Sequence, residues 1–204
     1  MFRASFIWIS LSCVLLVPAT GALASWSVGL SGGFTDGYRY HTYFFGPASL
    51  SGGGYPSIVA SKRLGNRVSL QLESSYLNFG SSYQRARFLP VGLGIRFLPV
   101  LNPEVRGKPY LQVSPALVVA QLRTRYTTFM LGSTTVDRGF TEVLPGAIAG
   151  AGIAGPIAGR LHLDLGLRYL WSTKVRDPER IISSGGRLDG LSQVSVTTAL
   201  ALAL

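Results

Sequence analysis

The segment from Arg160 to Trp171, RLHLDLGLRYLW, alternates between two kinds of side chain. Its odd-numbered positions are leucines that lead to Tyr169 and Trp171, and its even-numbered positions are mostly charged, polar or small. Successive side chains of a β-strand point to opposite faces, so a period of two predicts a strand. One face of this strand suits hydrocarbon, and the other carries charges and hydrogen-bonding groups.

The first 24 residues have the pattern of a cleaved signal peptide. A short basic start precedes an apolar stretch that is shorter than the about 20 residues of a spanning helix, and Ala22-Leu23-Ala24 fits a cleavage site. The only cysteine, Cys13, falls inside this leader. We therefore expect residues 25–204 to form one exported domain that uses neither disulfides nor thiol-bound metal.

The remainder of the chain contains eight segments with strand character. They cover residues 25–35, 54–64, 67–79, 85–97, 110–126, 140–154, 160–171 and 191–204. Pro115, followed by an apolar run, predicts a bulge in the fifth segment.

The connections between these segments alternate in length. Gly65-Asn66 and 155–159 are short, whereas the loops near 36–53, 127–139 and 172–188 are long. With an even number of strands, the short turns fall at the end that holds both termini, although 99–108 is long for that end. Short turns at one end and long loops at the other are typical of a transmembrane β-barrel.

The composition agrees with strands that meet lipid. Hydrophobic residues make up 47% of the chain and charged residues 14%, and the net charge of +10 is not gathered into the dense Lys/Arg runs of a nucleic-acid binder. A sheet in lipid must close on itself so that no edge is left with unpaired backbone groups. We therefore predict an all-β fold, an eight-stranded antiparallel up-and-down transmembrane β-barrel.

In its leader, strand count, loop asymmetry and alternating C-terminal strand, the chain resembles the small eight-stranded outer-membrane β-barrels of the OmpA/OmpX-like and porin-family type. The resemblance covers residues 25–204 and implies a location in the bacterial outer membrane, with lipid and lipopolysaccharide as surroundings. It also implies insertion by the barrel-assembly machinery through the C-terminal strand. Family members commonly end in an aromatic residue, whereas this chain ends in Leu204. We expect a monomer with no cofactor, no metal and no nucleic-acid partner.

The polar face of the strands predicts a closed, charged lumen. An eight-stranded barrel has just enough interior for its own side chains, and charges removed from water must be paired. We predict an ion-pair network of Glu73, Arg96, Asp164 and Arg168, with His162 beside it. The expected hydrogen-bond partners are Gln71, Gln112, Gln193 and Ser195.

Aromatic and basic residues gather in the predicted outer loops. Arg39, Tyr40 and Tyr43 lie in the first loop, and Arg125 and Arg176 lie near later ones. Arginine pairs well with phosphate, so these residues are candidates for contact with lipopolysaccharide or a partner protein. An interfacial aromatic girdle and ordinary solvated loop charge are the alternatives.

Three functions remain open. The favoured one is a structural, adhesive or envelope-integrity role with no catalysis and no open pore. The second is a lipid-A-modifying enzyme, an acyl hydrolase or acyltransferase, which would use His162 and a nucleophilic serine within about 2.6–3.2 Å. In a hairpin of the last two strands His162 falls opposite Leu200 to Ala201, and Ser195 falls near Arg168 instead. The third is a soluble lipocalin-like barrel that binds a small ligand with its apolar face turned inward.

Overall fold

The computed structural model describes residues 26–35, 38–42, 46–50, 52–80, 84–99, 107–128, 134–174 and 190–204. The predicted signal peptide, residues 1–24, lies outside this part of the chain. Within the described ranges, no helix has the length and apolar character needed to cross a membrane.

The described chain folds into β-strands. They are β1 (Trp26–Thr35), β2 (Tyr38–Thr42), β3 (Gly46–Leu50), β4 (Gly53–Arg63), β5 (Val68–Ser75), β6 (Leu77–Gly80), β7 (Gln84–Phe97), β8 (Lys108–Thr128), β9 (Thr134–Ala158), β10 (Leu161–Ser172) and β11 (Ser192–Ala203). The segments β5 and β6 together form one barrel strand that is interrupted at Tyr76, whose N–H donates to the Pro56 carbonyl at 3.0 Å. Apart from the small hairpin of β2 and β3, the elements therefore form the eight strands of a barrel, with β5 and β6 counted as one strand.

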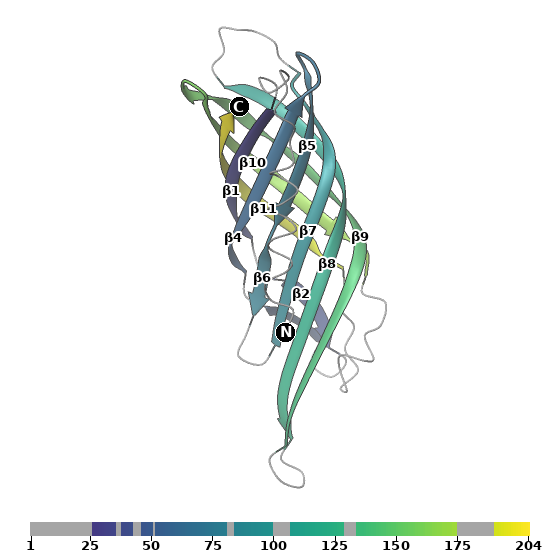
Figure 1. The fold of residues 1–204 in the computed structure, drawn as a ribbon. Coiled ribbons are helices and arrows are strands. Elements are labelled where there is room, and N and C mark those ends of the chain that lie inside the picture. Colours follow the sequence, from purple (N-terminus) through teal and green to yellow (C-terminus); the bar gives the residue numbers. More distant parts are fainter. Residues whose placement is uncertain are drawn as a thin grey trace.

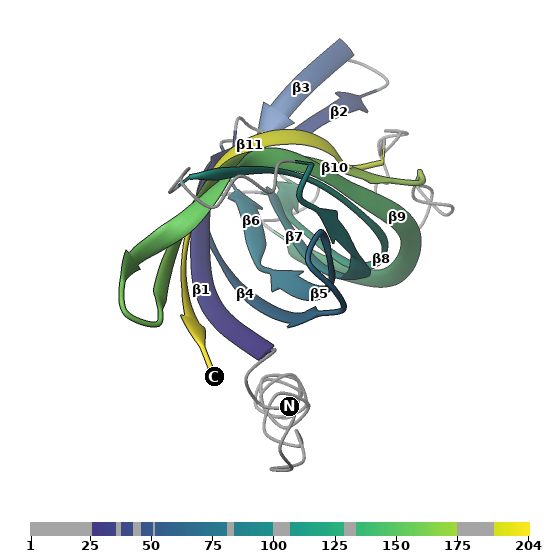
Figure 2. The ribbon, with the colours of Figure 1, turned by 90° about the horizontal axis from the view of Figure 1, so that it is seen from above.

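The sheet closes on itself (Figures 1 and 2). Each barrel strand pairs antiparallel with the next one along the chain, and β1 pairs with β11 from Ser27↔Ala203 to Thr35↔Ser195. The pairing of β5 with β7 joins the remaining ends of the sheet. Every barrel strand thus has two neighbours that bind its N–H and C=O groups, as a bilayer requires. The predicted eight-stranded antiparallel up-and-down barrel is confirmed.

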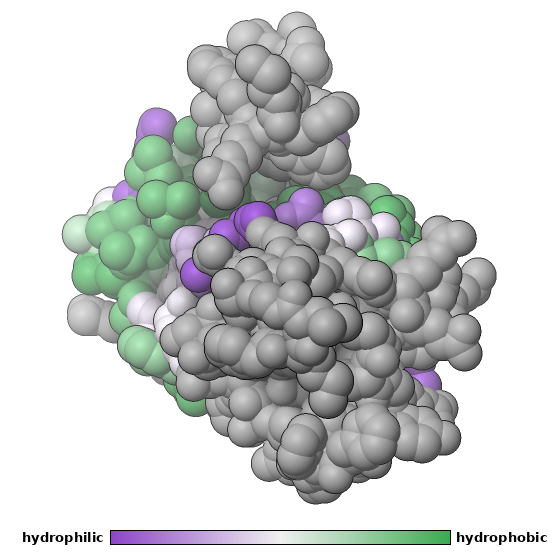
Figure 3. Space-filling view, turned by 90° about the horizontal axis from the view of Figure 1, so that it is seen from below, coloured by the Kyte–Doolittle hydropathy of each residue, from purple (hydrophilic) through white to green (hydrophobic). Residues whose placement is uncertain are grey.

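The outward face of the barrel is apolar. On β10, Leu167 is 56% exposed and Trp171 is 44% exposed, whereas Asp164 and Arg168 on the other face are buried. Large exposed hydrophobic side chains also occur on β1, β7, β8, β9 and β11, and Figure 3 shows hydrophobic residues along the flank. A water-soluble protein does not expose so extensive an apolar surface. The predicted directions of the two faces are confirmed, and the soluble barrel with an apolar face turned inward is wrong.

Two predicted loops contain strands. The first, residues 36–53, includes the β2–β3 hairpin, which pairs from Tyr38↔Leu50 to Thr42↔Gly46. The second, residues 127–139, is largely part of the β8–β9 hairpin, whose pairing continues to Thr128↔Thr134. Thr and Val favour strands even where the segment is polar overall. The β8–β9 hairpin therefore reaches far beyond the barrel at the loop end, at the bottom of Figure 1.

The bulge predicted near Pro115 is absent. Pairing of β8 with β9 runs without a shift through Pro115↔Ala147, and pairing with β7 keeps one register from Gly92↔Ala116 to Ile95↔Val113. Proline has no N–H, so it can interrupt the ladder without an inserted residue. A register shift does occur elsewhere, in the pairing of β9 with β10, between Leu161 and His162 and beside the tight turn where Gly159 adopts a φ of 52°.

A charged residue on the outward face should distinguish a barrel in lipid from one in water. We expect Leu167→Arg to lower the free energy of unfolding from lipid by about 2–4 kcal/mol, because Leu167 lies in the middle of the apolar band. The matched control is Leu64→Arg, since Leu64 is 59% exposed in the turn after β4 and should change stability by less than about 1 kcal/mol. Urea unfolding in lipid vesicles provides the measurement, and equal effects of the two substitutions would contradict this placement of the bilayer.

Candidate functional site

Four charged side chains meet inside the barrel, in the half of the lumen nearer the start of β1 and the end of β11, here called the inner half. Arg168 on β10 pairs with Glu73 on β5, with 3.2 Å between Nη1 and Oε2. Arg96 on β7 pairs with Asp164 on β10, with 2.7 Å between Nη1 and Oδ2. Glu73 is 1% exposed and Arg168 is 5% exposed, so these charges depend on one another for compensation. The structure thus brings together four of the five residues of the predicted network.

Glutamine side chains join the two ion pairs. Gln112 donates to Glu73 Oε2 at 3.0 Å and accepts from Arg96 at 3.4 Å, and Gln71 donates to Glu73 Oε2 at 3.3 Å. The chain of contacts therefore runs from Arg168 through Glu73 and Gln112 to Arg96 and Asp164. Since β5 and β10 lie on opposite sides of the closed sheet, this network spans the lumen.

Tyr110 is an additional member of the network. Its hydroxyl donates to Asp164 Oδ1 at 2.6 Å, and the guanidinium carbon of Arg96 lies 4.0 Å from its ring centroid. A Cβ atom at Gly152 or Gly166 would lie 2.7 or 2.5 Å from the Tyr110 hydroxyl. These inward glycines therefore leave room for the tyrosine.

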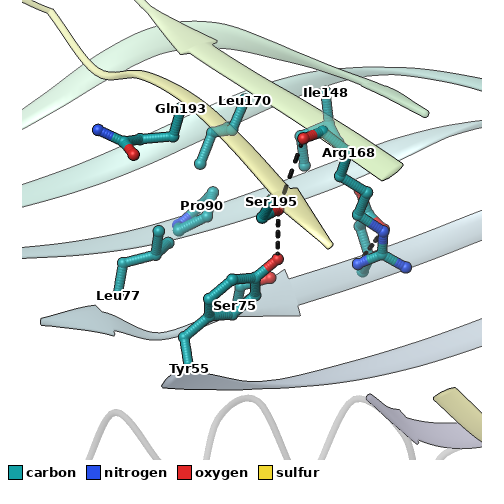
Figure 4. A pocket seen from close by; sticks show the side chains of 10 residues that line it. Tyr55, Ser75, Leu77, Pro90, Ile148, Arg168, Leu170, Gln193 and Ser195 are labelled. Atoms are coloured by element: carbon teal, nitrogen blue, oxygen red, sulfur yellow. Dashed lines mark hydrogen bonds and ion pairs between the residues drawn. The ribbon is translucent and has the colours of Figure 1, made fainter. Parts of the chain in front are cut away.

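A small cavity lies beside Glu73 and Arg168 (Figure 4). It measures about 20 Å³ and its lining includes Tyr55, Ser195 and Leu170. The Tyr55 hydroxyl lies 2.7 Å from Ser195 Oγ, while Glu73 Oε1 and Arg168 Nε are buried without a protein partner. A space of this size, next to unsatisfied polar atoms, has room for one water molecule.

The half of the lumen nearer the long loops, here called the outer half, is apolar. Tyr38 of the β2–β3 hairpin is 1% exposed, and its ring centroid lies 5.9 Å from that of Phe79 and 5.1 Å from that of Phe88. The apolar residues buried around these rings are Leu77, Ala86, Val118, Ala120, Leu122, Leu144, Ile148, Leu170 and Leu191. The prediction of a polar lumen is therefore wrong for the outer half, because hydrophobic packing occupies the interior there.

The structure does not build the predicted alternative site at His162. The residues paired with His162 are Pro156 on β9 and Ala201 on β11, while Ser195 lies opposite Arg168. No ion pair joins His162 to the four charged residues within the described part of the chain. A hydroxyl nucleophile would need to lie within hydrogen-bond distance of the imidazole, and Ser195 sits too far along the strand.

The predicted outer-loop contacts are placed only in part. Arg39 and Tyr40 belong to β2 and Arg125 belongs to β8. Tyr43 and Arg176 lie outside the described residues. The role of these five residues stays a prediction.

Three tyrosines, Tyr38, Tyr55 and Tyr110, were not placed in the lumen from the sequence. Tyr55 and Tyr110 alternate in phase with polar residues of the same strands, Ser57 in one case and Gln112 in the other, and that parity could have placed them inside. Tyr38 carries no such signal, because its position depends on how the β2–β3 hairpin packs against the barrel. Among the described residues, no group of three or more His, Cys, Asp or Glu side chains is arranged to hold a metal ion.

Removing both charges of a buried pair should cost less than the two single removals added together. Glu73→Gln keeps the size of the side chain but leaves the Arg168 guanidinium without its counter-charge, and we expect a loss of about 3–5 kcal/mol in unfolding free energy. The double variant Glu73→Gln/Arg168→Met should lose less than the sum of the single variants. Arg67→Gln, in an exposed turn, is the control and should change stability by less than about 0.5 kcal/mol. Additive losses in urea unfolding would show that the pair is not coupled.

Comparison with known proteins identifies the fold. No protein-family model and no curated protein matches the sequence. Among solved structures, Neisserial surface protein A (NspA) superposes with a TM-score of 0.58 at 13% identity, over 88% of this chain and 97% of that one. The outer membrane protein OprG from Pseudomonas aeruginosa superposes with a TM-score of 0.53 at 8% identity, over 90% of this chain and 99% of that one. The chain therefore has the fold of the small eight-stranded β-barrels of the bacterial outer membrane.

Proposed function

We propose that this chain is an integral outer-membrane barrel with a closed lumen, which serves as a structural or adhesive element of the cell envelope without catalysis and without an open pore. The apolar outward face and the likeness to outer-membrane barrels support the location. The β11 strand, Ser192–Ala203, is the segment through which the barrel-assembly machinery would recognise the chain.

The main support for a closed lumen is that side chains fill the interior of the barrel at successive heights. The ion pairs occupy the inner half, Tyr55 and Ser195 form a hydrogen bond in the middle, and Tyr38 packs on Phe79 and Phe88 in the outer half. A barrel of eight strands is narrow enough for side chains to fill. The cavity of about 20 Å³ accommodates water but no nutrient-sized solute.

Two features support a role without catalysis. The charged groups inside the lumen are engaged with one another, and His162 lacks a serine across the strand pair. A barrel without catalysis would then act through its outer loops. We propose that the loop residues bind lipopolysaccharide phosphates or a partner surface; these residues are Arg39, Tyr40, Tyr43, Arg125 and Arg176.

A closed lumen predicts that the protein does not conduct small solutes. Liposomes that contain the purified protein should swell in isotonic arabinose no faster than protein-free liposomes, whereas liposomes with a general porin should swell rapidly. Swelling that increases with the amount of this protein would overturn the proposal of a filled interior.

The absence of catalysis predicts unchanged lipid A. Mass spectra of lipid A from cells that express the protein, compared with cells that lack it, should show the same acyl chains and head-group masses. A His162→Ala variant separates the two functions, because an acyl-group change that depends on His162 would establish the enzymatic alternative.

A further inference from the structure

The end of the barrel where β1 begins, β11 ends and the short turns lie has a basic rim. Its cations are Lys62, Arg63, Arg67, Lys108 and Arg160. The described ranges at this end, 60–70, 95–99, 107–110, 156–163 and 200–204, contain no Asp or Glu. Short turns mark the periplasmic side of outer-membrane barrels, so this rim lies in the periplasmic leaflet of the bilayer in the membrane-inserted protein proposed above.

Lys62 differs from the other rim cations because its strand position faces outward. On β4 it follows Ile58 and Ala60 on the lipid-facing side, while Ser57 and Ser61 on the other side form hydrogen bonds inside the barrel. Its cross-strand partner is Trp26 on β1. The Lys62 Nζ lies 5.3 Å from the centroid of the Trp26 ring, which is a cation–π distance.

The pair lies where the apolar band ends. Val28 and Leu30 follow Trp26 on the outward face of β1, and Leu70 is the neighbour of Lys62 on β5. Tryptophan favours the boundary between hydrocarbon and head groups, and lysine extends its stem along apolar surface to keep its ammonium at the polar boundary. In the inserted barrel the ring would hold this ammonium near the depth of the lipid phosphates, and the ring itself carries no compensating negative charge.

We propose that Lys62 and Trp26 form a binding site for the phosphate group of an anionic phospholipid in the periplasmic leaflet. The Trp26 ring packs against the upper acyl chain and positions the ammonium, while Arg63, Arg67 and Arg160 supply a positive field around the site. The preference is for an anionic over a zwitterionic phospholipid, because both carry a phosphate but only the anionic lipid has a net charge that the rim attracts.

Quenching of Trp26 fluorescence by brominated lipids measures this preference directly. The sequence has three tryptophans, and Trp8→Phe with Trp171→Phe leaves Trp26 as the reporter. The protein is placed in vesicles of phosphatidylcholine that contain equal mole fractions of either brominated phosphatidylglycerol or brominated phosphatidylcholine. We expect a relative association constant about five-fold in favour of the anionic lipid, and a value near one after Lys62→Gln.

Two controls locate the effect. Lys108→Gln removes the same charge from the opposite wall of the barrel and should keep most of the preference. A reporter with Trp171 alone, made with Trp8→Phe and Trp26→Phe, lies at the other end of the band, and its ratio should not change on Lys62→Gln. Repeating the measurement in inorganic phosphate and in chloride at equal ionic strength should give the same ratio, since a soluble phosphate would compete only if the site did not require a lipid.

Each contrary result has a distinct meaning. Equal quenching by both brominated lipids, unchanged by Lys62→Gln, would overturn the lipid site while leaving the inserted barrel intact. An anionic preference at Trp26 that Lys62→Gln and Lys108→Gln lower equally would overturn it in favour of general attraction by the net charge. Absence of quenching by either lipid would instead contradict insertion and hence the proposed function itself.

Discussion

The structure depends on closure of the sheet between its first and last strands. The β1–β11 ladder provides bonding partners for two strands that would otherwise expose a row of unpaired backbone groups to lipid. Closure also defines the two environments that the side chains meet. Once β1 joins β11, every side chain of a barrel strand faces either the bilayer or the enclosed interior. The alternation of apolar and polar residues then becomes a requirement rather than a preference.

The interior satisfies this requirement in two different ways. The inner half contains a neutral set of two arginines and two carboxylates, tied together by glutamines and by Tyr110. The outer half is an ordinary hydrophobic core, to which the β2–β3 hairpin contributes Tyr38. Along the strand formed by β5 and β6 the change is abrupt. Before the interruption at Tyr76, the inward residues include Gln71 and Glu73. After it, the inward residues are Leu77 and Phe79.

The barrel strands were predictable because the alternation of side chains that defines each strand is a local feature of the sequence. The period of two in β10 and β11 reveals both the strands and the directions of their faces, and the pairing of His162 near Ala201 follows from the length of the hairpin. Contacts across the lumen were predictable only by charge type, as for Glu73 with Arg168, because only opposite charges can be buried together. The position of Tyr38 was not predictable, since it depends on how the β2–β3 hairpin packs against β6 and β7. The Pro115 bulge was wrongly predicted because a missing N–H can be tolerated without an added residue.

The ion pairs inside the barrel also constrain the order of assembly. Arg168 is on β10 and its counter-charge Glu73 is on β5, on the far side of the closed sheet. While the sheet is open, each of these side chains would face the hydrocarbon without its partner, at a cost of several kcal/mol per charge. If strands entered the membrane one at a time, the unpaired charges would remain exposed to hydrocarbon until the last strand closed the sheet. The charged interior therefore favours a route in which the sheet curls and nearly closes at the membrane surface, where water still reaches the lumen, before the barrel crosses the bilayer as a unit.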